Sequence, residues 1–262
     1  MERYLADYQR RFAKLPPSIQ NTLLRGQQIT KRMVANADQA LDRWALWEEL
    51  NEKLVEGSAF AEHVRFADAR GLVRIRFLLV EGTVLSTLKV TDHASSNNSL
   101  TACLLRGILA NDEVVSVLIS DEWLASGILP TSSQLLVVER ERQPQRLRWF
   151  NQRVPMGWSK SDQAPEVFDL KLSRQKLREL RNTSIAHPLE SLIDAPTYDD
   201  IRDAVDLSRQ VARAASLLFL GHASGLDGEM NKRREVVEDF WNVFERGLSH
   251  SNELQQAPAL DQ

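Results

Sequence analysis

The sequence has few of the residues that several functional classes require. Cys103 is the single cysteine among 262 residues, which excludes an internal disulfide framework and a multi-cysteine zinc or iron–sulfur site. The longest apolar runs, at 77–80 and 216–221, are far too short to cross a bilayer, and the charged N-terminal residues include no apolar signal-peptide core. We therefore expect a soluble protein of the reducing cytoplasm, without a membrane partner.

The short motifs of several large enzyme families are also absent. The chain has no GxxxxGK(S/T) phosphate loop, no GxGxxG, no HExxH and no GxSxG, so nucleotide hydrolysis, dinucleotide redox chemistry, zinc proteolysis and the usual serine-hydrolase mechanism lose their best support. The five histidines are scattered, and no two lie three or four residues apart as ligands on one helix face would. The sequence therefore predicts no metal site and no cofactor.

Glycine and proline are scarce, and this favours helices. Only 11 glycines and 9 prolines interrupt the chain, and strong helix formers such as Leu, Ala, Arg, Glu and Gln are common. Hydrophobic residues make up 43% of the sequence and charged residues 26%, as in an ordinary globular protein. We predict an all-α fold, with a length that allows one large domain or a compact domain carrying an extension.

Apolar spacing predicts four helices before residue 111, at about 2–14, 17–56, 59–90 and 100–108. Gly26 is a candidate interruption of the second helix, and Gly57 is its stop. The buried anchors expected in that helix are Leu23, Leu24, Trp44, Trp47 and Leu54. The third helix has apolar residues at steps of three and four, which predicts a core-facing stripe of Val73, Phe77, Val80, Val84 and Leu88.

The middle segment, 111–169, is rich in β-branched residues at 114–120 and 134–140, which is compatible with strands, but we favour helices there and a connecting loop at 154–168. Thr197 and Asp200 resemble a capping box, from which a helix is expected to run to about Leu220 and to stop at Gly221. A last helix is expected at about 228–247, followed by a polar tail.

One stretch combines a permanent cation with a titratable acid–base group. Residues 181–187 read Arg-Asn-Thr-Ser-Ile-Ala-His, at the end of a basic helix expected over 170–186. His187 precedes Pro188, which ends the helix and frees the histidine to line a cleft. Metal-independent RNA cleavage needs these two groups: a histidine to move protons, and a guanidinium to stabilise charge on the phosphorane.

The segment resembles the hallmark of the HEPN superfamily, Arg-x(4 to 6)-His, often with a polar residue after the arginine. The sequence LRELRNTSIAHPLE at 177–190 resembles the corresponding segment of AbiU-type HEPN proteins, which belong to bacterial toxin and phage-defence systems. Residues 77–108 resemble the helix, polar loop and helix that precede the motif in that group. The resemblance implies Arg181 as the transition-state cation, His187 as the acid–base residue and Asn182 as a polar orienting residue.

The resemblance also implies an architecture and partners. It implies an up-and-down helical bundle at 41–225, with additional N-terminal helices at 1–40, a middle insertion at about 111–169, and a C-terminal helix and polar tail at 226–262. Members of the superfamily dimerise and bring two Arg/His pairs into one cleft, and many are metal-independent endoribonucleases. We therefore expect a homodimer, an RNA substrate and, in a toxin or defence setting, an antitoxin or other partner protein.

The charge distribution supports a phosphate ligand. Residues 140–181 contain 11 basic and 5 acidic side chains, an excess of six positive charges in a chain whose net charge is -3. Trp149, Phe150 and Trp158 are interleaved with these charges, as in surfaces that bind phosphates and unstacked bases. The candidate nucleic-acid-binding residues are Arg146, Arg148, Arg153, Arg174 and Arg178.

Two other functions fit the same sequence. A non-catalytic module of the same fold would serve as a partner or regulatory subunit, with Arg181 and His187 forming an ordinary helix-end contact. A helical nucleic-acid-binding protein would use the basic segment without cleaving its ligand.

Overall fold

The computed structural model describes residues 12–55, 60–61, 64, 66–91, 101–127, 133–154, 177, 197–221 and 230–256. Within these ranges the secondary structure is helical and includes no strand. The predicted all-α fold is thereby confirmed for them. The helices are α2 (Pro17–Lys53), α4 (Phe66–Thr91), α5 (Ala102–Ile108), α6 (Asp112–Leu118), α7 (Asp121–Gly127), α8 (Ser133–Arg153), α10 (Tyr198–Phe219) and α11 (Met230–Gln256).

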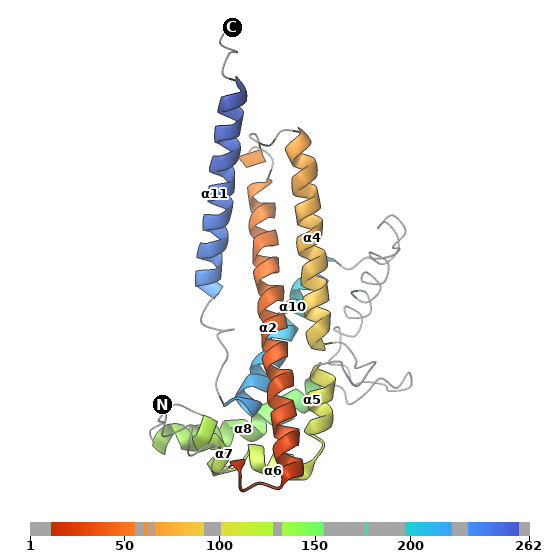
Figure 1. Ribbon diagram of the computed structural model, residues 1–262, viewed down its shortest axis with the longest axis vertical. Helices are drawn as coiled ribbons and strands as arrows, with labels where there is room; N and C mark the ends of the chain where they lie inside the picture. Colours follow the sequence, from red (N-terminus) through yellow and green to blue (C-terminus); the bar gives the residue numbers. More distant parts are fainter. Residues whose placement is uncertain are drawn as a thin grey trace.

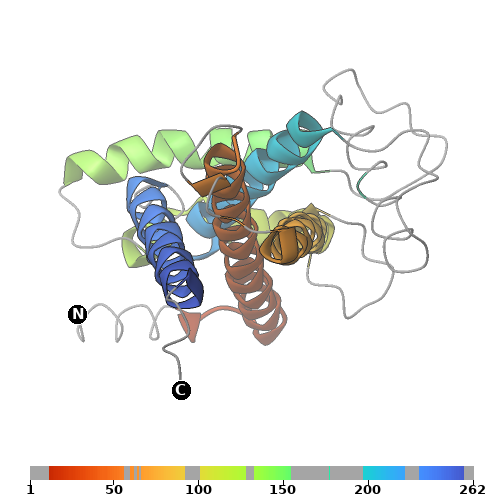
Figure 2. The same cartoon turned by 90° about the horizontal axis from the view of Figure 1, so that it is seen from above.

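The 37-residue helix α2 is the axis around which the others are arranged. Its most extensive contacts are with α4 and α10. Figure 1 shows α4 and α11 beside the C-terminal half of α2, and α5 to α8 gathered around its N-terminal half. Seen from above, α10 and α8 lie on the far side of α2 from the viewer of Figure 1 (Figure 2). The boundary expected near residue 40 lies inside α2, which passes it without interruption.

Two hydrophobic clusters share α2. The larger cluster includes Leu23 and Met33 of α2 together with Leu218 of α10, all completely buried. The smaller cluster joins the C-terminal part of α2 to α4 and α11 through Leu50, Leu72 and Trp241. Both clusters contain apolar side chains of α2, so this helix is part of both.

Helix α10 matches its sequence pattern most closely. Thr197 accepts a hydrogen bond from the Asp200 backbone N–H at 3.1 Å, and Asp200 accepts one from the Thr197 N–H at 2.8 Å, which confirms the capping box. Gly221 has a φ of 72°, the left-handed conformation expected of a helix stop. One face of this helix is buried in the core and consists of Ile201, Val205, Ser208, Ala212, Ala215 and Phe219.

The paired tryptophans pack in a helix interface of the same chain. The Trp44 and Trp47 rings are stacked with their centroids 4.6 Å apart, and the Tyr198 ring lies 4.4 Å from Trp47. The first turn of α10 is therefore held against α2 near Trp47. Cys103 is buried, as expected for a small hydrophobic side chain.

Two residues predicted to be buried are exposed. Leu24 is 44% exposed, because it lies about 100° around the helix from Leu23 and only Leu23 faces the larger cluster. Val73 is 65% exposed, because the N-terminal part of α4 directs Leu72 into the smaller cluster instead. The predicted stripe on this helix is buried only where it reaches Val84 and Leu88.

Helix boundaries also differ from expectation. Helix α11 runs to Gln256, nine residues past the predicted end at 247. The helix predicted at about 100–108 spans Ala102–Ile108, with Thr101 as its N-cap. Most of the helix predicted at 2–14 and all but the first residue of the loop predicted at 154–168 lie outside the described residues.

Gly26 does not interrupt α2 but allows another helix to approach it. A Cβ atom built at Gly26 would lie 2.3 Å from Cε1 of Phe219, far inside van der Waals contact. Phe219 is completely buried at the end of α10, and its carbonyl accepts a 3.2 Å hydrogen bond from Gln27 Nε2. The missing side chain thus sets the closest approach of α2 and α10.

We expect Gly26→Ala to lower the free energy of unfolding by about 1–3 kcal/mol, because the added methyl group overpacks the crossing. Gly71 is the matched control, since a Cβ there meets nothing within 4 Å. Gly71→Ala should instead raise stability by about 0.5–1 kcal/mol through helix propensity. Urea unfolding followed by circular dichroism measures both, and equal effects of the two substitutions would contradict the crossing.

Candidate nucleic-acid interface

The residues of the Arg/His motif lie outside the described part of the chain. Arg181, Asn182 and His187 belong to this group, as do two of the basic residues predicted to bind nucleic acid, Arg174 and Arg178. Leu177 is described, is completely buried, and belongs to the larger hydrophobic cluster. The chain is therefore anchored in the core four positions before Arg181.

The other predicted basic residues lie on α8, where they divide into different environments. Arg146 forms an ion pair with Glu139, and the Arg153 guanidinium lies 5.5 Å from the centroid of the Trp149 ring. Arg148 is exposed to solvent. Arg140, which contributes to the basic composition of this segment, binds both carboxylate oxygens of Asp121 on α7.

A groove of about 610 Å³ lies between α8 and α10. Each helix contributes four side chains at i, i+3, i+4 and i+7, the spacing of a single helix face. Three of the eight are arginines and two are glutamines. The lining residues are Arg142, Gln145, Arg146, Trp149, Gln210, Arg213, Ala214 and Leu217.

The sequence-based prediction is only partly reproduced by this groove. Arg146 and Trp149 line it, whereas Arg148 and Arg153 are not among the lining residues, although Arg153 lies over the Trp149 ring. Phe150, which was also considered as a stacking residue, is completely buried in the core. Trp158 lies outside the described residues.

The contribution of α10 was not predicted. Gln210 and Arg213 come from a helix whose sequence was interpreted only as a core element. A signal was present, since 210, 213, 214 and 217 repeat the spacing of 142, 145, 146 and 149. That signal identifies a polar face on each helix, but it does not show that the two faces meet.

One carboxylate organises the arginines of α8. Glu139 lies one turn before Arg142, 3.9 Å from its Nη1 atom, and two turns before Arg146, which donates hydrogen bonds to both carboxylate oxygens. The side chains of Arg146 and Glu139 are 18% and 17% exposed, so this pair is less screened by water than a surface pair. Three arginines line the groove, and two of them, Arg142 and Arg146, share the Glu139 carboxylate.

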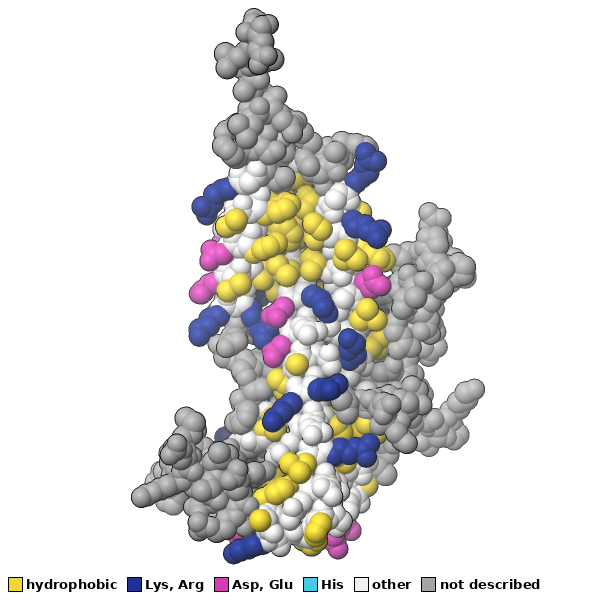
Figure 3. Space-filling model, viewed as in Figure 1, with side chains coloured by type: hydrophobic (Ala, Val, Ile, Leu, Met, Phe, Trp, Pro, Cys, Tyr) yellow, Lys and Arg dark blue, Asp and Glu magenta, His cyan; other side chains and the backbone are white. Residues whose placement is uncertain are grey.

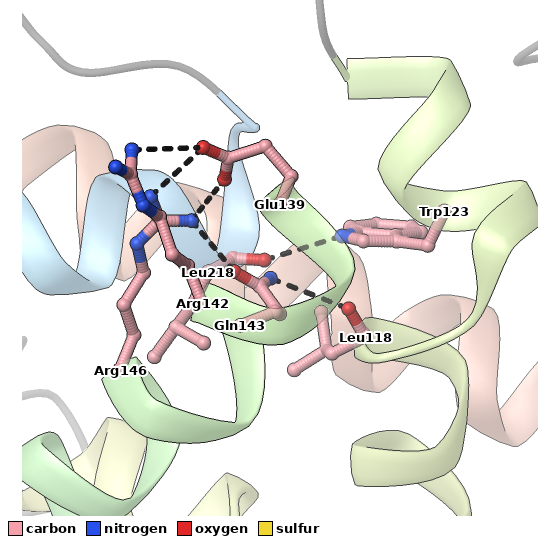
Figure 4. A network of polar contacts seen from close by, with 7 residues as sticks. All are labelled: Leu118, Trp123, Glu139, Arg142, Gln143, Arg146 and Leu218. Atoms are coloured by element: carbon pink, nitrogen blue, oxygen red, sulfur yellow. Dashed lines mark hydrogen bonds and ion pairs between the residues drawn. The ribbon is translucent and has the colours of Figure 1, made fainter. Parts of the chain in front are cut away.

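The walls of the groove are fixed by buried hydrogen bonds (Figure 4). Gln143 is 1% exposed; its Nε2 donates to the Leu118 carbonyl at 3.3 Å, and its Oε1 accepts from Arg146 at 3.3 Å. Trp123 Nε1 donates to the Leu218 carbonyl at 3.2 Å, which attaches α7 to the end of α10. Since unpaired buried amide and carbonyl groups are costly, these bonds hold α8 and α10 in place.

The side chains that line the groove are suited to binding a phosphodiester backbone. Guanidinium groups present planar donors that match phosphate oxygens, and they stay charged at physiological pH. The Trp149 indole supplies a surface on which a base can stack, and the amides of Gln145 and Gln210 can donate to or accept from base edges. Ala214 and Leu217 provide an apolar floor.

The two shifted pKa values of the described residues belong to groups that do not line the groove. Burial raises the pKa of the Glu48 carboxyl, a shift that a hydrogen bond with Trp44 opposes. Burial lowers the pKa of the Arg106 guanidinium. The charge of the groove therefore depends on arginines rather than on a group that titrates near neutrality.

In the described ranges, no three His, Cys, Asp or Glu side chains are placed to hold a metal ion. Every helix within the same ranges is too short or too polar for a bilayer span. Comparison with protein-family models, curated proteins and solved structures gives no match to this chain.

We expect Glu139→Gln to strengthen the binding of polyanions, because it removes the negative charge that Arg142 and Arg146 share. Retention on immobilised heparin should move to higher salt. Glu141→Gln is the matched control, since Glu141 is an exposed residue of the same helix that does not line the groove. An equal shift for both variants would mean that only net charge matters.

Proposed function

We propose that this chain is a metal-independent endoribonuclease of HEPN type, acting as a homodimer in a toxin or phage-defence setting. The observation that carries the proposal is the Arg-Asn-Thr-Ser-Ile-Ala-His segment at 181–187. The all-helical fold agrees with a helical bundle of this type, and the burial of Leu177 anchors the chain just before the motif. The homodimer and the toxin or phage-defence setting are proposed from the resemblance of 177–190 to AbiU-type proteins.

The proposed chemistry needs no group beyond the protein. His187 accepts the proton of a ribose 2′-hydroxyl as that oxygen attacks the adjacent phosphorus, or donates a proton to the departing 5′-oxygen. Arg181 stabilises the negative charge of the phosphorane, and Asn182 orients the reacting groups. The products are a 2′,3′-cyclic phosphate and a 5′-hydroxyl end.

We expect the purified protein to cleave RNA in the presence of EDTA, and His187→Ala or Arg181→Ala to reduce the rate by about 10²–10⁴-fold. His93→Ala, which removes a histidine outside the motif, should cleave like the wild type. Gel analysis of end-labelled RNA measures the rates. A His187→Ala protein that cleaves as fast as the wild type would refute the proposed chemistry.

The α8–α10 groove favours a second candidate function, the binding of single-stranded nucleic acid without cleavage. Three arginines, two glutamines and a tryptophan on an apolar floor suit a phosphate backbone with exposed bases. The two functions are compatible, since an endoribonuclease must also hold its substrate. They are separated by whether RNA that binds the groove is also cut.

We expect the double variant Arg142→Ala/Arg213→Ala to weaken binding of single-stranded RNA. The slope of log affinity against log salt concentration should fall by at most about 1.4, because each phosphate contact to a single strand contributes about 0.7. Arg148→Ala is the control from the same helix, outside the groove. Fluorescence anisotropy with a labelled oligonucleotide at several salt concentrations measures both, and equal losses would remove the groove from the binding surface.

A further inference from the structure

Helix α11 has an apolar stripe that does not face its own bundle. Val236, Phe240 and Val243 are 68%, 52% and 65% exposed. Steps of four and three residues place them within about 60° of one another around the helix axis. Figure 3 shows hydrophobic side chains gathered over the same half of the molecule, between α11 and α4. A stripe of this kind on a helix surface marks an interaction site.

A different face of α11 attaches it to the bundle. Trp241 is 1% exposed, and its Nε1 donates to the Leu46 carbonyl at 3.2 Å. Arg233 forms ion pairs with Asp38 and Asp42, and Lys53 donates to Asn242 Oδ1 at 3.0 Å. Trp241 lies about 100–160° around the helix from the three residues of the stripe, so the stripe stays accessible while the helix is held in place.

On the other side of the stripe, charges alternate with a period of seven. Lys232, Asp239, Arg246 and Glu253 follow one another at steps of seven residues, with signs that alternate along the helix. The side chains of Asp239 and Arg246 are exposed. An apolar seam repeating at four and three residues, with charges beside it every seventh residue, is the pattern of a helix that pairs with another helix.

We propose that α11 pairs antiparallel with α11 of a second copy of this chain, around a twofold axis close to residues 241 and 242. In that register Phe240 packs against Val243 of the second copy, and Val236 packs against the position of Gly247. Gly247 has open space around it, since a Cβ there meets nothing within 4 Å. The same rotation brings Asp239 beside Arg246 of the second copy, twice per dimer.

The alternating charges favour α11 of a second copy as the partner, in the antiparallel orientation. In an antiparallel pair related by a twofold axis, Asp239 faces Arg246 and Lys232 faces the position of Glu253, so opposite signs meet at every such position. In a parallel pair, Asp239 and Arg246 would instead lie beside Phe244 and Ser251 of the second copy, which offer no opposite charge. The proposal does not depend on RNA cleavage, because every residue that it uses lies on α11.

Charge reversal tests the dimer in full-length protein without RNA. Sedimentation should show a dimer for the wild type, and Asp239→Arg or Arg246→Asp should each raise the dimer dissociation constant at least about tenfold, because like charges then meet twice. An equimolar mixture of the two single variants should restore a dimer, since one chain then carries two arginines and the other two aspartates. The double variant Asp239→Arg/Arg246→Asp should also dimerise.

Glu238→Arg is the control: an exposed position one residue away, with the same change of charge. It should leave the dimer intact. Thermal unfolding followed by circular dichroism checks that each variant is folded. A monomeric wild type, a dimer that both single variants leave unchanged, or single variants that do not dimerise when mixed would overturn the proposal. Each of these outcomes leaves the cleavage assay at His187 to be decided separately.

Discussion

The crossing of α2 and α10 at Gly26 is the contact on which the rest of the fold depends. The absent side chain lets the Phe219 ring lie against the α2 backbone, and Gln27 joins the two helices by a hydrogen bond. This close approach lets a whole face of α10 become buried, which leaves the opposite polar face, with Gln210 and Arg213, directed towards α8. The groove is thus a consequence of how tightly the core packs.

Local features of the sequence predicted much of the fold. The capping box at Thr197, the stop at Gly221 and the buried face of α10 are determined by residues within a few turns of one another, so periodicity and turn chemistry identify them. Gly26 was misinterpreted because its role is set by Phe219, a residue 193 positions later in the sequence. Leu24 was misplaced because apolar spacing does not show which of two adjacent positions faces the core.

The candidate site could be predicted only in part for the same reason. Arg146 and Trp149 were identified from composition because they lie in one basic segment of the sequence. Arg213 was missed because its proximity to them depends on the packing of α8 on α10. In the proposed function the two kinds of site are complementary, since arginines hold the phosphate backbone at any physiological pH while a histidine near neutrality moves the proton.

Glu139 gives the groove an internal counter-ion. Its carboxylate accepts a hydrogen bond from the Arg146 guanidinium group and lies 3.9 Å from that of Arg142. The positive charges of both arginines are therefore partly neutralised before a ligand binds. A phosphate entering the groove would therefore compete with a tethered carboxylate as well as with dissolved ions. The displaced carboxylate stays attached to the protein, so cations are released from the nucleic acid but no anion is released from the protein. The affinity of such a groove varies less with ionic strength than its number of arginines implies.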